Sequence, residues 1–312
     1  MKNLKRLVSL IMLFLIIFFA SCSGKNYNET DKSVNKLAVR KDVELNIVTT
    51  DKLLYNMVKS IVKDRHVVEY MFNNRSGEMN FKFTEDSVNN ISKKDLFFYV
   101  GAGFEPWIDS FVDKLNKNKV GVTNVSRGVQ LLTYNKTVKY DGRILKYNPY
   151  YFTNIDNYRI MLMNIKNALQ DKDPQNRDIY EKNFSEALKN LNSYKNDLKS
   201  VDDQLSDYNF IVAEDQLSYF VKYNNLNALE INPGENGSII PKDPDEKQSL
   251  EQKLKNSNII FLYNDEAILK DNAEILKDYN IKAVKIEIYD GDLTYEDTLK
   301  YNIKNLGNIY KR

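Results

Sequence analysis

The sequence predicts an α/β protein in which two βα-sandwich lobes, with mainly parallel sheets, are joined by one long rigid α-helix. Two observations support this fold class. Strand-like and helix-like segments alternate along the chain on both sides of its centre, and the centre itself is one long amphipathic segment at 174–205. Alternation of this kind predicts parallel βαβ units whose sheets are covered by helices.

The central segment has the spacing of a helix with one apolar face. Its apolar residues follow one another at steps of four and three, which places them on one side of an α-helix. These residues are Tyr180, Phe184, Ala187, Leu191, Tyr194, Leu198, Val201 and Leu205. Pro174 suits the first turn, and Asp173 before it can cap the helix. At 1.5 Å per residue the helix is roughly 48 Å long. A short coiled coil or a surface helix would show the same pattern, but the βα arrays on both sides favour a connector between lobes.

The part before this helix predicts four strands, at 44–50, 67–72, 95–100 and 120–125, with helices at 51–62, after Thr84 and after Glu105. Residues 73–83 are expected to form an irregular loop, and residues 133–151 interrupt the alternation. Gly101-Ala102-Gly103 predicts a tight strand-to-helix turn. A dinucleotide fingerprint would need a third glycine where Pro106 stands, so nucleotide binding is not expected.

The part from residue 155 onwards predicts helices at 155–169, 216–223, 244–256, 265–279 and 294–310, with strands at 209–213, 229–231, 258–263 and 283–288. Ligands of open α/β sheets bind beyond the carboxyl ends of the strands. We therefore expect a ligand cleft between the two βα arrays.

The N-terminus has the pattern of a secretory leader. Lys2, Lys5 and Arg6 precede an apolar run at 7–20, which is short for a membrane span. Cys22, the only cysteine, follows this run and small residues, as in a bacterial lipobox. We expect a signal peptide at 1–21, a flexible tether at 22–43, an N-terminal lobe at 44–172, the helix at 173–206 and a C-terminal lobe at 207–312. The protein would then be extracytoplasmic and anchored to the cell membrane by lipid on Cys22. A plain signal peptide with a chance cysteine is the alternative.

Charge and composition exclude several classes. Removing the three positive charges of the leader changes the formal net charge from +2 to −1, which gives no electrostatic reason to expect nucleic acid. Without a further cysteine, the mature chain has no internal disulfide. The only histidine, His66, is predicted to be an exposed turn residue. The chain therefore lacks a histidine for a catalytic Ser/His or Cys/His set. Glu214-Asp215 could serve acid–base chemistry, but adjacent acids at a strand end are ordinary, and we do not expect an enzyme.

Three segments carry a resemblance to a known family: DLFFYVGAGFEPWIDSFVDKL at 95–115, the stretch 148–184 from Asn-Pro to Phe184, and YEDTLKYNIKNL at 295–306. In their order and content they resemble the substrate-binding lipoproteins of ABC transporters for zinc and manganese. The resemblance implies two α/β lobes, a long rigid helix between them and a metal ion held in the cleft. It also implies a monomer that delivers the ion to an ABC permease driven by its ATPase.

The resemblance also implies four metal-ligand positions, which fall here on Met79, Tyr150, Glu214 and Asp290. Glu287 and Asp292 are close alternatives for the fourth. The histidines usual at the first two positions are absent, and Zn²⁺ prefers nitrogen and sulfur ligands. Oxygen donors suit a hard cation such as Mn²⁺ or ferric iron. Tyrosines and asparagines near these positions leave open a metal chelate or a small organic ligand. A surface lipoprotein that has lost metal binding and acts as an adhesin remains the alternative function.

Overall fold

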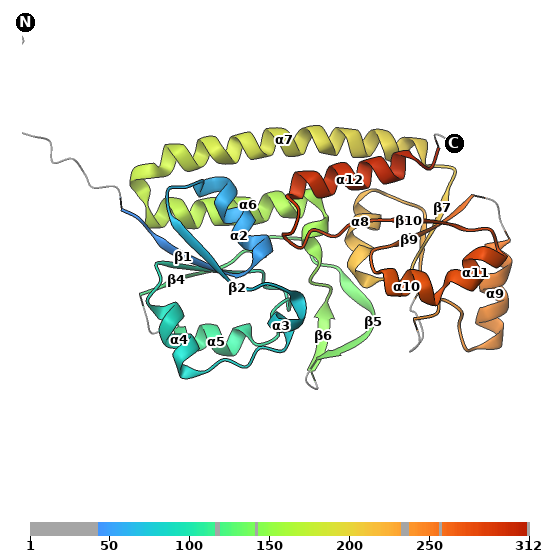
Figure 1. Cartoon of the computed structure of the whole chain (residues 1–312), viewed down its shortest axis with the longest axis horizontal. Helices are drawn as coiled ribbons and strands as arrows, with labels where there is room; N and C mark the ends of the chain where they lie inside the picture. The colour runs from blue at the N-terminus through green and yellow to red at the C-terminus, as the bar shows by residue number, and fades with distance from the viewer. Residues whose placement is uncertain (1–42, 116–118, 141–142, 232–236, 256–257, 311–312) are drawn as a thin grey trace, which may run out of the picture. The chain divides into compact units, whose positions relative to one another are not determined.

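The computed structural model describes residues 43–115, 119–140, 143–231, 237–255 and 258–310. Residues Val43–Arg312 form one compact unit. The predicted leader, the lipid-anchor residue Cys22 and almost all of the predicted tether lie outside the described residues. The alternation of strands and helices predicted for the rest of the chain is present, and the predicted fold class is confirmed (Figure 1).

The N-terminal half contains a four-stranded parallel sheet with the strand order β2-β1-β3-β4. In the central strand β1, Val48 lies opposite Glu69 of β2 on one side and Phe97 of β3 on the other. The elements of this half are β1 (Asn46–Asp51), α2 (Lys52–Val62), β2 (Val67–Phe72), α3 (Arg75–Met79), α4 (Glu85–Ser92), β3 (Leu96–Tyr99), α5 (Ile108–Leu115) and β4 (Gly121–Asn124).

The C-terminal half contains a second four-stranded parallel sheet, with the order β10-β9-β7-β8. Its elements are β7 (Asn209–Val212), η3 (Asp215–Leu217), α8 (Ser218–Tyr223), β8 (Ala228–Glu230), α9 (Pro244–Leu254), β9 (Ile259–Tyr263), α10 (Glu266–Asp271), α11 (Ala273–Asp278), β10 (Lys282–Lys285) and α12 (Tyr295–Gly307). The single helix expected at 265–279 is divided in two at Asn272, whose buried side chain bonds the backbone of Gly237, Ile239 and Ile268.

The long helix α7 (Arg177–Gln204) lies between the two sheets in the sequence and packs on α2, α6 and α12 (Figure 1). It is preceded by α6 (Ile155–Lys172) and by the 3₁₀ turn η2 (Pro174–Asn176). The predicted apolar face is confirmed, since Tyr180, Phe184, Leu191, Leu198 and Val201 are buried and the other members pack against the same core. Its 28 residues span about 42 Å. A continuous helix that packs on both halves restricts hinge motion between them.

A β-hairpin and a short helix occupy the two segments that were predicted to have no regular secondary structure. Residues 133–151 contain the antiparallel strands β5 (Thr133–Tyr140) and β6 (Arg143–Tyr147), followed by η1 (Tyr151–Thr153). The predicted loop 73–83 contains α3, which Asn74 caps by accepting a hydrogen bond from the Gly77 N–H at 2.8 Å. The hairpin projects away from α7 (Figure 1).

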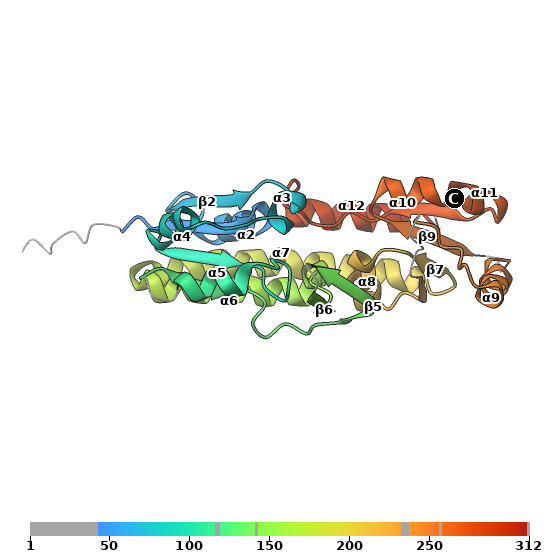
Figure 2. The same cartoon turned by 90° about the horizontal axis from the view of Figure 1, so that it is seen from below.

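The core is arranged in layers on both sides of each sheet. One large buried cluster joins the inner faces of both sheets to α2, α6, α7 and α12. Separate clusters cover the outer faces, under α4 and α5 in the N-terminal half and under α9 and α11 in the C-terminal half. The view from below shows the resulting layers along α7 (Figure 2). The shared inner cluster means that the two halves are packed together and not merely linked.

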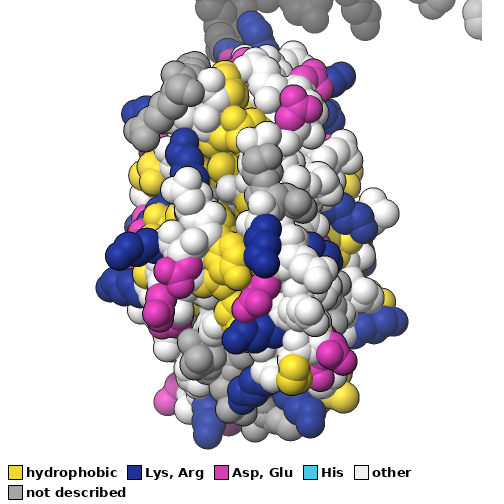
Figure 3. All heavy atoms as spheres, turned by 90° about the vertical axis from the view of Figure 1, so that its right-hand side faces the viewer, with side chains coloured by type: hydrophobic (Ala, Val, Ile, Leu, Met, Phe, Trp, Pro, Cys, Tyr) yellow, Lys and Arg dark blue, Asp and Glu magenta, His cyan; other side chains and the backbone are white. Residues whose placement is uncertain are grey.

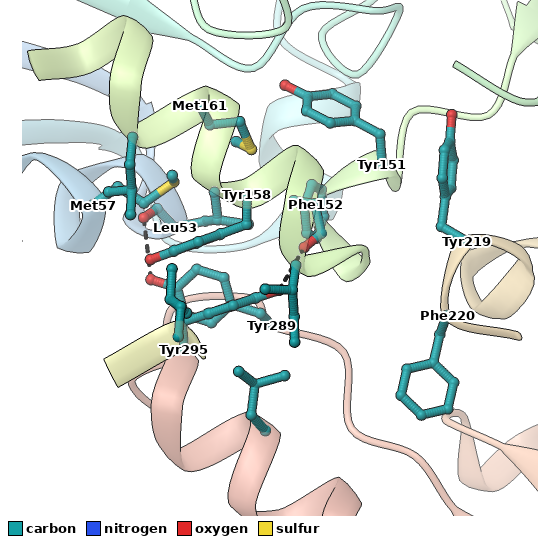
Figure 4. Packing of buried hydrophobic residues seen from close by; sticks show 14 of the residues in the cluster. Leu53, Met57, Tyr151, Phe152, Tyr158, Met161, Tyr219, Phe220, Tyr289 and Tyr295 are labelled. Carbon is teal, nitrogen blue, oxygen red and sulfur yellow. Dashed lines mark hydrogen bonds between the residues drawn. The ribbon is translucent and has the colours of Figure 1, made fainter. Parts of the chain in front are cut away.

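The segment after β10 returns to the N-terminal half and is fixed there by tyrosines (Figure 4). The rings of Tyr158 and Tyr295 stack with centroids 3.6 Å apart. The Tyr295 hydroxyl donates to the Phe152 carbonyl at 3.1 Å, and the Tyr289 hydroxyl donates to the Leu53 carbonyl at 3.2 Å. These residues come from α2, η1, α6, α12 and the β10–α12 loop. The loop is thereby held against the start of α2.

The prediction that His66 is an exposed turn residue is wrong, because its side chain is buried with 4% of the residue exposed. His66 Nδ1 accepts the Leu45 N–H at 3.3 Å, and Nε2 lies 2.5 Å from the Tyr180 hydroxyl. That hydroxyl donates to Asp173 Oδ2 at 2.5 Å. Asp173 also accepts from the Asn176 side chain and makes no side-chain cap, contrary to the prediction. The histidine joins the start of β1 to the start of α7.

None of the helices in the described part of the chain is both long and apolar enough to cross a membrane. One end of the compact unit mixes basic and acidic side chains around a narrow apolar strip (Figure 3). This mixture of signs agrees with the near-neutral net charge of the sequence.

Candidate functional site

A cavity of about 540 Å³ lies where strand ends of both sheets meet. Its walls come from the ends of β1 and β2, the loop after β3, the residues before η1, and the loops after β7, β9 and β10. This is the position expected for a ligand between two open parallel sheets. The carboxylic acids that line it are Asp51, Glu78, Asp265, Glu266, Glu287, Asp290 and Asp292, and the basic residues are Lys52, Arg75 and Lys285. Acidic groups outnumber basic groups, so the cavity is electrostatically suited to a cation.

The turn Gly101-Ala102-Gly103 positions one wall of this cavity. All three residues have positive φ, at 77°, 55° and 83°. A Cβ on Gly101 would lie 2.2 Å from Asn124 Oδ1, so only glycine fits there. The predicted tight turn after β3 is therefore present. It brings Phe104 into the cavity wall and folds Glu105 back under the end of the strand.

Glu105 is a buried carboxylate, 1% exposed, held by the backbone it follows. Its carboxylate accepts the N–H groups of Val100 and Gly101 at 2.7 and 2.9 Å, and the Thr50 hydroxyl at 2.7 Å. Burial raises the pKa of Glu105, and the three hydrogen bonds oppose that rise. Glu105 thus places a fixed acidic group behind the cavity wall.

Glu78 and Arg75 form an ion pair in the cavity wall. Glu78 is 1% exposed, and its Oε2 accepts from Arg75 Nη1 at 2.8 Å. The other oxygen, Oε1, is buried and has no hydrogen-bond partner. Burial and repulsion from Glu105 and Asp51 raise the pKa of Glu78 to about 9, against the attraction of Arg75. A buried carboxyl oxygen without a partner is costly, and a water molecule or a cation in the cavity would stabilise it.

Asp51 adds a third acidic group at the end of β1. Its Oδ1 accepts the Leu54 N–H at 2.8 Å and so caps α2. Burial, followed in the same direction by repulsion from Glu105, raises the pKa of Asp51 to about 7. Asp51, Glu78 and Glu105 thus form a group of carboxyls that repel one another when ionised. Although the charge of Arg75 acts against it, burial makes the three carboxyls hold protons more tightly than exposed acids do.

Of the first two predicted ligands, Met79 and Tyr150, only Tyr150 lines the cavity. Met79 is half-buried and is not among the residues that line the cavity, whereas its neighbour Glu78 is. Tyr150 lines the cavity, with its ring 5.9 Å from that of Phe104 and 6.0 Å from that of Phe152. Glu78 is therefore the better candidate at the first position.

Of the other two predicted ligands, Asp290 and Glu214, only Asp290 lines the cavity. Asp290 is exposed and lines the cavity, and its Oδ1 accepts the Asp292 N–H at 2.9 Å. Glu214 is not among the lining residues, because its carboxylate accepts the N–H groups of Asn264 and Asp265 at 2.8 and 3.0 Å. Burial raises the pKa of Glu214, while these two hydrogen bonds act against the rise. Through these two hydrogen bonds, Glu214 stabilises the loop after β9.

The alternatives for the fourth position, Glu287 and Asp292, also line the cavity, and both are paired with lysines. Glu287 lies 3.3 Å from Lys285, and Asp292 lies 2.5 Å from Lys52. Within the described ranges, no group of three or more His, Cys, Asp or Glu side chains is close enough together to hold a metal ion. The predicted set therefore does not form a closed coordination cage in this conformation.

Sequence reasoning missed Asp51, Arg75, Glu78 and Glu105 as site residues. Two of them carried a usable signal: Asp51 ends a β-branched strand and starts a helix, and Glu105 follows the Gly-Ala-Gly turn. Both lie at the carboxyl ends of neighbouring parallel strands, β1 and β3, where ligands gather. Arg75 and Glu78 gave no such signal, because α3 was expected to be irregular.

A ligand cavity between two parallel sheets, with one long helix packed on the helices of both halves, is the architecture of a two-lobed substrate-binding protein. The comparisons with known proteins agree. The family model ZnuA, described as "Zinc-uptake complex component A periplasmic", matches residues 47–309, and the chain belongs to this family.

Three similar proteins illustrate the relation. A metal ABC transporter substrate-binding lipoprotein of Lactococcus lactis is 27% identical, over 86% of this chain and 82% of that relative. The manganese ABC transporter substrate-binding lipoprotein scaA of Streptococcus gordonii is 26% identical, over 98% of both chains. The crystal structure of the metal-dependent lipoprotein YcdH of Bacillus subtilis superposes with a TM-score of 0.70 at 22% identity, over 85% of this chain and 99% of that chain. These findings confirm the predicted family and assign the chain to the substrate-binding proteins rather than to enzymes.

Proposed function

We propose that this chain is the lipid-anchored, extracytoplasmic binding component of a metal importer, and that it carries a divalent metal cation to an ABC permease and its ATPase. Family membership supports the transport role, and the leader pattern that ends at Cys22 supports the anchor. The similar proteins of Lactococcus lactis and Streptococcus gordonii are named as substrate-binding lipoproteins of a metal and a manganese ABC transporter.

We propose Mn²⁺ as the cargo, held by oxygen ligands. The observation that carries this proposal is the buried, unpartnered Oε1 of Glu78 in a cavity that acidic side chains dominate. Neither the cavity wall nor the predicted ligand set contains histidine or cysteine, the ligands that Zn²⁺ prefers. Carboxylate, phenol and water oxygens suit Mn²⁺ better.

The proposed ligands are Glu78, Tyr150 and Asp290, all of which line the cavity. Met79 and Glu214 have a weaker claim, because neither lines it. The cavity is far larger than a bare ion, so the cation would keep part of its water shell, with carboxylates accepting hydrogen bonds from that water. Hydrated binding agrees with the absence of a closed cage among the described residues.

Calorimetry on metal-stripped protein with Mn²⁺, Zn²⁺ and ferric iron tests this proposal. We expect Mn²⁺ to bind, and Glu78→Gln to weaken Mn²⁺ binding at least tenfold, because a neutral amide attracts a cation less than a carboxylate. Glu85→Gln is the matched control: Glu85 is an exposed acid of the same lobe that pairs with Lys114 away from the cavity. Binding of Zn²⁺ or ferric iron without any binding of Mn²⁺ would refute the choice of cargo. If no ion binds, the adhesin alternative replaces metal transport.

A further inference from the structure

We propose that Arg75 is a tethered cation that occupies the carboxylate cluster when cargo is absent and sets the threshold for cation binding. This inference rests on the proposed function, and it concerns the regulation of the same site. The cluster consists of Asp51, Glu78 and Glu105.

Arg75 contacts one member of this cluster directly and rests on a neighbouring aromatic ring. Its Nη1 donates to Glu78 at 2.8 Å, and its guanidinium lies 3.7 Å above the centre of the Phe104 ring. Its charge also acts on Asp51 and Glu105, since it opposes the rise in pKa of all three carboxyls. The positive charge of one guanidinium therefore acts on three carboxyl groups, each of which is buried or half-buried.

The guanidinium competes with a cargo cation for the same oxygens. A cation that binds Glu78 must share the carboxylate with Arg75 or displace the Arg75 side chain. A guanidinium and a metal ion that are bound to the same carboxylate repel each other. The side chain of Arg75 is 30% exposed while that of Glu78 is 2% exposed, so Arg75 can swing toward solvent and Glu78 cannot. The Phe104 ring is a face on which the planar cation rests in the absence of cargo.

Tryptophan fluorescence can report on this exchange directly. Trp107 is the only tryptophan of the chain, and its indole N–H donates to the backbone carbonyl of Glu78 at 2.8 Å. Its ring also contacts those of Phe72 and Phe81. A cation bound at Glu78 is therefore expected to alter the emission of Trp107.

The test compares Arg75→Gln, Arg75→Lys and Lys52→Gln with the wild type, by calorimetry and Trp107 emission during titration with Mn²⁺ at one pH. We expect Arg75→Gln to tighten Mn²⁺ binding at least tenfold. Arg75→Lys keeps the charge and should stay within threefold of the wild type. Lys52 lines the same cavity but pairs with Asp292, so Lys52→Gln removes one cavity charge without freeing Glu78 and should tighten binding no more than threefold.

Four outcomes overturn the inference. Weaker binding by a folded Arg75→Gln variant, confirmed by an unchanged circular dichroism spectrum, would mean that Arg75 supports the cargo. Equal tightening by Lys52→Gln would mean that only net cavity charge matters. Equal binding by Arg75→Gln and the wild type would refute the inference and leave the proposed function intact. If neither protein binds any metal, the proposed function fails, and the inference fails with it. Binding by Arg75→Gln alone supports the threshold role.

Discussion

Replacing Tyr180 by Phe removes one hydroxyl that joins two buried polar groups. This hydroxyl lies 2.5 Å from His66 Nε2 and donates at 2.5 Å to Asp173 Oδ2. In the variant, His66 Nε2 keeps its longer contact with Asp173 Oδ2, at 3.5 Å, but loses the shorter one with the hydroxyl. Losing a hydrogen bond to a charged group costs about 1.5–3 kcal/mol, and an unsatisfied buried donor costs about 1–3 kcal/mol. Because His66 can shift toward Asp173 and recover part of this, we expect a loss of about 3 kcal/mol in the free energy of unfolding.

Urea unfolding followed by circular dichroism and by Trp107 emission measures this loss. With an m-value of about 2–3 kcal/mol per molar urea, the midpoint should fall by about 1 M. Coincident midpoints from the two signals establish a single transition. Tyr301→Phe is the matched control, since Tyr301 is a 38% exposed tyrosine on α12. If Tyr180→Phe unfolds within about 0.5 kcal/mol of Tyr301→Phe, the buried network does not stabilise the fold as argued here.

Two further predictions concern stability. Burial lowers the pKa of His66, although Asp173 opposes the shift, so the unfolded chain takes up the proton first as the pH falls below about 6.5. The wild type should therefore lose stability relative to His66→Gln as the pH falls from about 6.5 toward the lower folded value, by at most about 1.4 kcal/mol per pH unit. Urea midpoints at several pH values check this, and a constant difference would contradict it. Gly291 has φ +95°, and an added Cβ would lie 2.7 Å from the Leu53 nitrogen, so Gly291→Ala should cost about 1–3 kcal/mol in thermal unfolding. Gly307→Ala, with its nearest contact at 3.4 Å, should cost nothing, and equal losses would show that the Gly291 contact does not matter.

Periodicity predicted the fold well because it reflects burial, which the sequence records locally. The apolar face of α7 and the continuous strand before Gly101 both lie where their patterns place them. His66 was misplaced for a physical reason: a polar residue between a helix and a strand is ordinarily exposed. Its burial depends on Tyr180 and Asp173, more than 100 positions away, whose matching polar atoms no local pattern reveals.

The candidate site was predicted less well than the fold, because alignment of a motif does not fix the direction of a side chain. Tyr150 and Asp290 line the cavity, and both positions were implied by the resemblance to the family. Met79 and Glu78 are neighbours, and only the helical turn of α3 decides which one faces the cavity. Glu214 was chosen as an acid at the end of β7, but the backbone N–H groups after β9 already use its carboxylate.

The packing around the cavity indicates which part of the wall can change when cargo binds or leaves. Opening the halves as a hinge would separate the Tyr158–Tyr295 stack and break the hydrogen bonds of Tyr289 and of Asn56, which holds the Gly291 carbonyl at 2.8 Å. The same motion would bend α7, whose apolar face belongs to the core shared by both halves. By contrast, α3 has only five residues, so its rearrangement disturbs few buried contacts. Since this helix carries both Arg75 and Glu78, exchange of cargo through local movement of α3 requires far less disruption than separation of the lobes.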